Sequence, residues 1–82
     1  MAEKEVGKVS SYFTNVEVAA IDLSGALKVG DKIHIKGHTT DFEQAVKSMQ
    51  INRKDVKSAK AGDSVGIKVD ERVRPGDIVY KA

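Results

Sequence analysis

The stretch Leu27-Lys28-Val29-Gly30-Asp31-Lys32-Ile33-His34-Ile35 contains the two signals that decide the fold. Gly30 can supply the positive φ of a tight turn, and the Asp31 carboxylate can accept hydrogen bonds from nearby backbone amides. Beyond the turn, Ile33 and Ile35 alternate with polar residues, which is typical of a strand with one buried face. The stretch therefore predicts a turn that starts an amphipathic β-strand.

The same Gly-Asp pair precedes an alternating segment at two further places, residues 62–63 and 76–77. In the second of these, Pro75-Gly76 fits the central positions of a type II turn, because proline presets φ and glycine accepts a positive φ. The alternating residues that follow are Val65, Ile67 and Val69 in one segment, and Ile78 and Tyr80 between Val79 and Lys81 in the other. Three turns of one kind thus predict three strands.

The composition also favours β-structure. The 82 residues include 17 valines and isoleucines but only two leucines, and β-branched side chains suit a pleated surface better than a helix. The chain has no cysteine, which excludes a disulfide framework and a thiolate metal site. We expect an N-terminal tail over residues 1–5 and a single domain over residues 6–82.

Three further segments, residues 5–13, 16–23 and 43–52, are apolar but less regular. In the second and third, the apolar positions change parity, which indicates a β-bulge, a bend or an irregular pattern without structural meaning. Residues 41–49 could begin a helix at Thr40 or Asp41, but Val46 and the alternating tail favour a strand. The count is six strands, or seven if residues 52–60 contribute one, and short connections predict antiparallel pairing in a small closed barrel.

The order of the motifs resembles the second domain of translational GTPases such as elongation factor Tu. The matching motifs are Gly7-Lys8-Val9, residues 26–35, Val46-Lys47-Ser48-Met49-Gln50, residues 59–67 and Arg74-Pro75-Gly76-Asp77-Ile78-Val79. The resemblance implies an all-β fold, a six- to seven-stranded antiparallel Greek-key β-barrel of the translation-factor domain 2 type. No Gly-x-x-x-x-Gly-Lys-Ser/Thr phosphate loop is present, so the nucleotide-binding domain of those GTPases is missing.

A second resemblance is closer than the first over two short stretches of the sequence. Gly37-His38-Thr39-Thr40-Asp41-Phe42 and Ser48-Met49-Gln50-Ile51 are similar to the C-terminal module of collagenase-like peptidases. This similarity implies an accessory domain that works beside an enzyme.

The charge pattern offers one candidate contact surface. The formal net charge is only +2, but five of the basic residues lie between residues 47 and 60 beside a single acidic residue, Asp55. The five are Lys47, Arg53, Lys54, Lys57 and Lys60. Such a run is either a solvated loop or a patch that faces an RNA backbone or the ribosome.

The loop at residues 37–42 is the second candidate. His38, Thr39, Thr40 and Asp41 form either a polar connection that satisfies turn amides or a binding loop, and we expect Phe42 to re-enter the core. Near the N-terminus, Tyr12 could stack on a base, whereas we expect Phe13 to lie in the core or to plug the end of the barrel.

No combination of residues predicts catalysis. His34, His38 and Asp41 are too few for a metal site, and Ser10 and Ser11 lie in nothing that resembles a nucleophile elbow. We therefore expect a non-enzymatic binding module with no cofactor or metal, which contacts RNA, the ribosome or a protein partner. The alternative is a free-standing accessory domain of a peptidase-like or RNA-modifying enzyme. A charged amino terminus and short apolar runs favour a cytoplasmic protein without a membrane segment.

Overall fold

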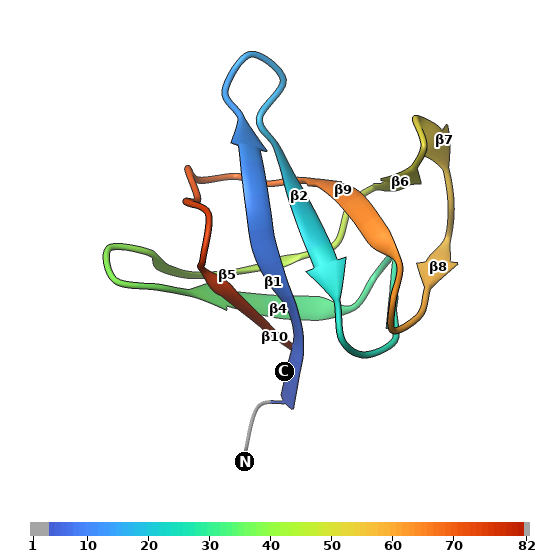
Figure 1. Ribbon diagram of the computed structural model, residues 1–82, viewed down its shortest axis with the longest axis horizontal. Helices are drawn as coiled ribbons and strands as arrows, with labels where there is room; N and C mark the ends of the chain where they lie inside the picture. The colour runs from blue at the N-terminus through green and yellow to red at the C-terminus, as the bar shows by residue number, and fades with distance from the viewer. Residues whose placement is uncertain (1–3, 82) are drawn as a thin grey trace.

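The computed structural model describes residues 4–81 as an antiparallel all-β fold (Figure 1). Of the predicted tail at residues 1–5, residues 1–3 lie outside the described residues, whereas Lys4 and Glu5 belong to the first strand. Between residues 4 and 81 we find no helix with the length and hydrophobicity needed to cross a membrane.

The six predicted strands are all present, together with three strands of two residues each. The strands are β1 (Lys4–Phe13), β2 (Val18–Leu23), β3 (Leu27–Lys28), β4 (Lys32–Lys36), β5 (Asp41–Ala45), β6 (Met49–Ile51), β7 (Lys54–Asp55), β8 (Ser58–Ala59), β9 (Ser64–Lys68) and β10 (Ile78–Lys81). The number exceeds the expected six or seven because a bend divides the predicted strand at residues 43–52 into β5 and β6, and because β3, β7 and β8 are short additions.

The strand order confirms the predicted Greek-key topology. Eight strands form one sheet in the order β5-β4-β10-β1-β2-β9-β6-β7, and β3 pairs with β8. The last strand, β10, lies between β1 and β4, and β9 lies between β2 and β6. These long-range insertions into the sheet are the connections of a Greek key.

The bend between β5 and β6 brings the two ends of the sheet together. β5 pairs with β4 at one end, β6 pairs with β9 toward the other end, and only three residues separate β5 from β6. Val46 and Met49 are both buried although they differ in parity, so the chain changes face between them as predicted. The ring of strands therefore closes through a continuous bent strand rather than through a backbone ladder between β5 and β9.

A side chain supplies the hydrogen bonds that such a ladder would make. The amide nitrogen of Gln44, in β5, donates to the carbonyl of Lys68 at 3.0 Å, and its oxygen accepts from the backbone N–H of Asp70 at 2.7 Å. Gln44 is only 7% exposed. Its amide acts as a substitute peptide group between β5 and the end of β9, in a place where unpaired backbone groups would be costly.

The three Gly-Asp turns have the predicted geometry. Gly30, Gly62 and Gly76 have φ values of 98°, 95° and 98°. In each turn the aspartate carboxylate accepts a hydrogen bond from the backbone N–H three residues earlier, at 2.9–3.1 Å; the donors are Lys28, Lys60 and Arg74. Each turn is thus closed by its own aspartate immediately before β4, β9 or β10 begins.

The core consists mainly of the predicted branched residues, with two corrections. Ile33, Ile35, Val65 and Ile67 are at most 2% exposed, as expected. In β10, however, Val79 is the buried residue, while Ile78 and Tyr80 are half-buried, because Val79 lies between Gly7 of β1 and Ile35 of β4.

The second correction concerns residues 16–23. β2 buries Ala19, Ile21 and Leu23 without any change of parity, and its register with β9 is continuous. The irregularity lies in the partner strand, since β1 contains an extra residue between Val9 and Ser11. The sequence pattern of β2 was therefore misleading, and the bulge belongs to β1.

The role of Gln44 is testable with Gln44→Leu, which keeps the volume but removes the amide. The variant leaves the Asp70 N–H and the Lys68 carbonyl without this partner, so we expect the free energy of unfolding to fall by about 1–3 kcal/mol. Gln50→Leu is the matched control, because the exposed side-chain amide of Gln50 donates to the Asp55 carboxylate, at 2.9 Å, and to no buried backbone group. Urea denaturation measures both, and equal losses would show that Gln44 does not close the barrel.

Candidate functional site

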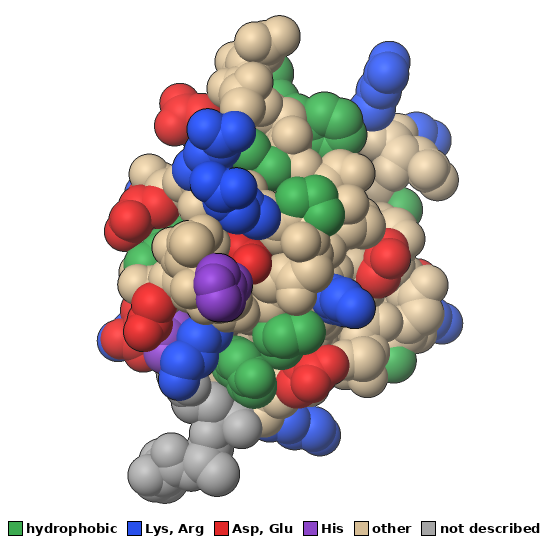
Figure 2. Space-filling model, turned by 60° about the vertical axis from the view of Figure 1, so that its left-hand side comes forward, with side chains coloured by type: hydrophobic (Ala, Val, Ile, Leu, Met, Phe, Trp, Pro, Cys, Tyr) green, Lys and Arg blue, Asp and Glu red, His purple; other side chains and the backbone are tan. Residues whose placement is uncertain are grey.

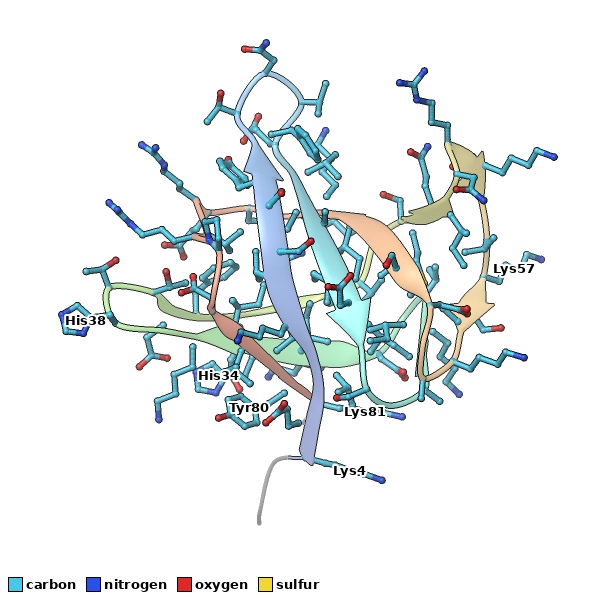
Figure 3. The ribbon with its side chains drawn as sticks, viewed as in Figure 1. Lys4, His34, His38, Lys57, Tyr80 and Lys81 are labelled. Atoms are coloured by element: carbon cyan, nitrogen blue, oxygen red, sulfur yellow. The ribbon has the colours of Figure 1, made fainter. Side chains whose placement is uncertain are left out.

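Four of the five predicted basic residues lie together on one projection. We call residues 52–60, which include β7 and β8, the basic arm; it extends from the edge of the main sheet (Figure 1). Arg53, Lys54, Lys57 and Lys60 are all exposed on it. The structure thus leaves these four cations open to solvent on one segment, and Figure 3 shows Lys57 directed outward from it.

The fifth basic residue, Lys47, lies outside the arm and is paired. Its ammonium group donates to the carboxylate of Asp70 at 2.9 Å, and it lies at the bend between β5 and β6. This partner is 23 residues away in the sequence, so charge counting could not reveal it. The pairing reduces the cationic character of Lys47 relative to the arm.

The turn at the end of the arm is unusual. Asn52 and Arg53 connect β6 to β7 with φ values of 53° and 65°, and the pairing of Ile51 with Lys54 makes this a two-residue hairpin. Turns with two positive φ values favour Asn followed by Gly. Arginine in place of glycine costs roughly 1 kcal/mol, so the chain presents a cation where glycine would fit more easily.

The pockets beside the arm are small. One of about 230 Å³ lies between Val29 and Val56, and another of about 290 Å³ lies between β3, β8 and Lys81. Pockets that enclose small organic ligands usually measure about 300–1,000 Å³ and are mostly apolar. These two shallow sites therefore suit a surface contact better than an enclosed substrate.

The loop at residues 37–42 is only partly available for contacts. His38, Thr39 and Asp41 are exposed, but Thr40 is 5% exposed and thus buried, which removes it from the predicted contact set. A Cβ on Gly37 would lie 1.9 Å from the Asp77 carboxylate, so the loop packs closely against the third Gly-Asp turn. Phe42 packs against the core, as predicted.

Asp41 has a specific partner in the neighbouring strand. Its carboxylate is hydrogen-bonded to Nε2 of His34, and this bond is the main reason that the pKa of Asp41 is below its ordinary value of 3.8. The ring of Tyr80 lies 6.5 Å from that of His34, whereas His38 lies at the outer end of the loop (Figure 3). In the part of the chain that the structure describes, no three His, Cys, Asp or Glu side chains are grouped as metal ligands.

The aromatic pair near the N-terminus has the opposite arrangement to the one predicted. Tyr12 packs against the core, while Phe13 is 54% exposed, so Phe13 neither fills the core nor plugs the barrel. Val16, which the sequence did not single out, is 57% exposed in the same hairpin. The bulge in β1 causes the reversal, because it shifts the strand by one residue before Tyr12.

Comparisons with known proteins agree with both resemblances. The family model described as elongation factor Tu domain 2 matches residues 23–80. An "uncharacterized protease" of Methanocaldococcus jannaschii is 52% identical over 77 residues, and a "collagenase" of Porphyromonas gingivalis is 38% identical over 78 residues. Each match covers 93% of this chain but only 19% and 22% of those proteins, so the chain spans about a fifth of the length of these curated relatives.

A solved structure matches the fold over nearly its whole length. The crystal structure of the C-terminal domain of a Geobacillus thermoleovorans protein assigned to the U32 peptidases superposes with a TM-score of 0.90. The match covers 95% of this chain and 99% of that one, at 18% sequence identity. At that identity, the likeness establishes the fold alone.

The strained turn leads to a prediction for Arg53→Gly. Glycine adopts the positive φ without the steric conflict of a Cβ, so we expect the variant to be more stable by about 0.5–1 kcal/mol. Lys57→Gly is the matched control, since it removes a cation from the same arm at a residue without a positive φ. Thermal and urea denaturation compare the variants, and no gain for Arg53→Gly would contradict the strain.

Proposed function

The chain belongs to the elongation factor Tu domain 2 family, and we propose that it serves as an accessory protein-interaction domain for a peptidase-like enzyme. The observation that carries the proposal is the 52% identity, over 93% of the chain, to one segment of a much longer protein described as a protease. The matched segment makes up about a fifth of that relative. We therefore expect such a domain to act together with the rest of an enzyme of that kind.

Physical features support a contact role rather than a catalytic one. The barrel is filled by its own side chains, and 15 buried hydrophobic residues among residues 4–81 form one cluster. The pockets described above are shallow, and the Ser10 hydroxyl, one of the candidate nucleophiles, donates to the carbonyl of Ala20. We therefore propose that this chain contributes binding surface and no catalytic group of its own.

A second candidate, contact with RNA or the ribosome, is favoured by the basic arm. Arg53 is held in an unfavourable turn conformation beside Lys54 and Lys57, and exposed cations of this kind suit a phosphate backbone. The relatives described as peptidases support the first candidate more directly, because their names say nothing of RNA.

Co-expression tests the first candidate. The tagged chain is produced with a peptidase-like protein from the same organism that lacks a copy of this domain, and we expect a complex that survives size-exclusion chromatography. A homologue that retains its own copy is the matched control and should not bind, because its own domain occupies the contact. Recovery of ribosomal components alone would contradict the proposal.

Sedimentation with ribosomes or RNA tests the second candidate. The variant Arg53→Glu, Lys54→Glu and Lys57→Glu should abolish any salt-dependent association, since each lost phosphate contact lowers the slope of log affinity against log salt by roughly 0.7–0.9. The control makes the same charge change at three exposed lysines off the arm, Lys4, Lys8 and Lys36. Equal effects of the two triple variants would show that the arm makes no specific contact.

A further inference from the structure

The tip of the β1–β2 hairpin carries an apolar surface that the barrel does not use. Phe13 and Val16 are 54% and 57% exposed, and they are two of the three large hydrophobic residues that are exposed among residues 4–81. Phe13 pairs across the hairpin with half-buried Val18. We call Phe13, Val16 and Val18 the hairpin tip surface.

The bulge in β1 is what turns Phe13 outward. Val9 is buried, so regular alternation would also direct Ser11 and Phe13 toward the core. The extra residue, Ser10, shifts by one position the alternation of inward and outward side chains. Its hydroxyl fixes the bulge by donating to the carbonyl of Ala20 at 3.1 Å. Tyr12 consequently lies opposite buried Ala19. Bulges commonly re-aim a side chain in this way near functional surfaces.

The turn that presents Val16 contains a residue with an unfavourable backbone conformation, and hydrogen bonds hold the turn in place. Glu17 has a φ of 56°, which a residue with a Cβ rarely adopts. Its carbonyl accepts a hydrogen bond from the N–H of Val69 at 2.9 Å, and the N–H of Val16 donates to the carbonyl of Phe13 at 3.3 Å. The tip is therefore anchored to the barrel, so its apolar side chains are presented without a large loss of entropy on binding.

The surroundings of the tip match the composition of protein interfaces. The segment from residue 69 to residue 77 runs beside the hairpin, because Val69 bonds to Glu17 and Gly76 bonds to Val9. It carries exposed Arg72 and Arg74, and Figure 2 shows Lys or Arg side chains next to hydrophobic ones in the upper half of the molecule. Aromatic residues and arginine are enriched in protein–protein contacts, so exposed Phe13 beside two arginines fits that composition.

The partner proposed for the hairpin tip surface follows from the length of the curated relatives. In the two curated relatives the matched segment belongs to a protein about five times as long, so a large further part of the chain is covalently joined to it. Lys4 and Lys81, the first and last described residues, pair at the opposite end of β1 from the tip (Figure 3). A body joined at either end would thus leave the tip accessible. Its docking there requires a connecting segment that spans the ten residues of β1, and with such a segment the effective concentration of the joined body favours docking.

We propose that the hairpin tip surface is the face by which this domain docks onto the body of a peptidase-like enzyme, with Phe13 and Val16 as the anchors. The inference rests on the proposed function and adds the surface that performs it. A base-stacking platform fits less well, because Phe13 is the one exposed ring at the tip, Tyr12 is packed inward and Val16 is aliphatic.

The test uses the full-length M. jannaschii relative, with this chain in place of its 77 matched residues. Hydrogen–deuterium exchange is compared between the free chain and the chimera, and we expect the amides of residues 14–18 to exchange at least about tenfold more slowly in the chimera. Phe13→Ser with Val16→Ser should remove this protection. Val29→Ser, at the third exposed hydrophobic residue, is the matched control and should retain it.

The other outcomes separate the two hypotheses. Protection of a different face in the chimera would overturn the docking surface and leave the accessory function standing, whereas no protection anywhere on the domain would contradict both. Loss of binding to a labelled single-stranded RNA, caused by the double variant in the free chain, would overturn the proposal in favour of a nucleic-acid contact. If the chimera does not fold, the double substitution is made at the aligned positions of the natural relative, and the same loss of protection is required.

Discussion

The barrel depends on one local interaction that occurs three times: an aspartate carboxylate that accepts a hydrogen bond from the backbone N–H three residues earlier, across a glycine with positive φ. Each turn fixes where the next strand begins, and therefore which of its residues face inward. Because β4, β9 and β10 all start from such turns, their branched side chains meet in one core. A shift of a single residue at any of them would expose that strand's whole apolar set.

The rest of the ring is completed without further regular turns. The bend between β5 and β6 carries the chain from one end of the sheet to the other, and Gln44 bonds to Lys68 and Asp70 where the backbones do not pair. A polar side chain that is 7% exposed is acceptable there because its amide is satisfied on both sides. The interior of the barrel is thus filled by the side chains that stabilise it, and the surfaces open to contacts lie on its outside.

The sequence was sufficient for the fold because its signals are local. Gly-Asp turns and period-two alternation depend on neighbours in the chain, and the family motifs occur in the order of the strands. The surface was less predictable, because exposure depends on pairing between distant segments. Lys47 pairs with Asp70 from another part of the chain, Thr40 is buried in its loop, and Phe13 is turned outward by a bulge in β1, whereas the parity pattern pointed to β2. None of these three outcomes can be inferred from alternation or charge counts within one segment.

Backbone strain distinguishes the turns that start core strands from the hairpin turns that extend away from the barrel. In the described chain, glycine occupies the positive-φ position of all three turns that start core strands, and nothing lies within 4 Å of the Cβ each would have. The positive-φ residues that are not glycine are Glu17, Asn52 and Arg53, and they lie in the two hairpin turns that project outward. Asn52 suits its position, but if these turns served only to connect strands, glycine would be the less costly choice in place of Glu17 and Arg53. Keeping side chains at strained positions makes sense where those turns present neighbouring groups to a partner, which is the role argued for the hairpin tip surface and, as the second candidate, for the basic arm.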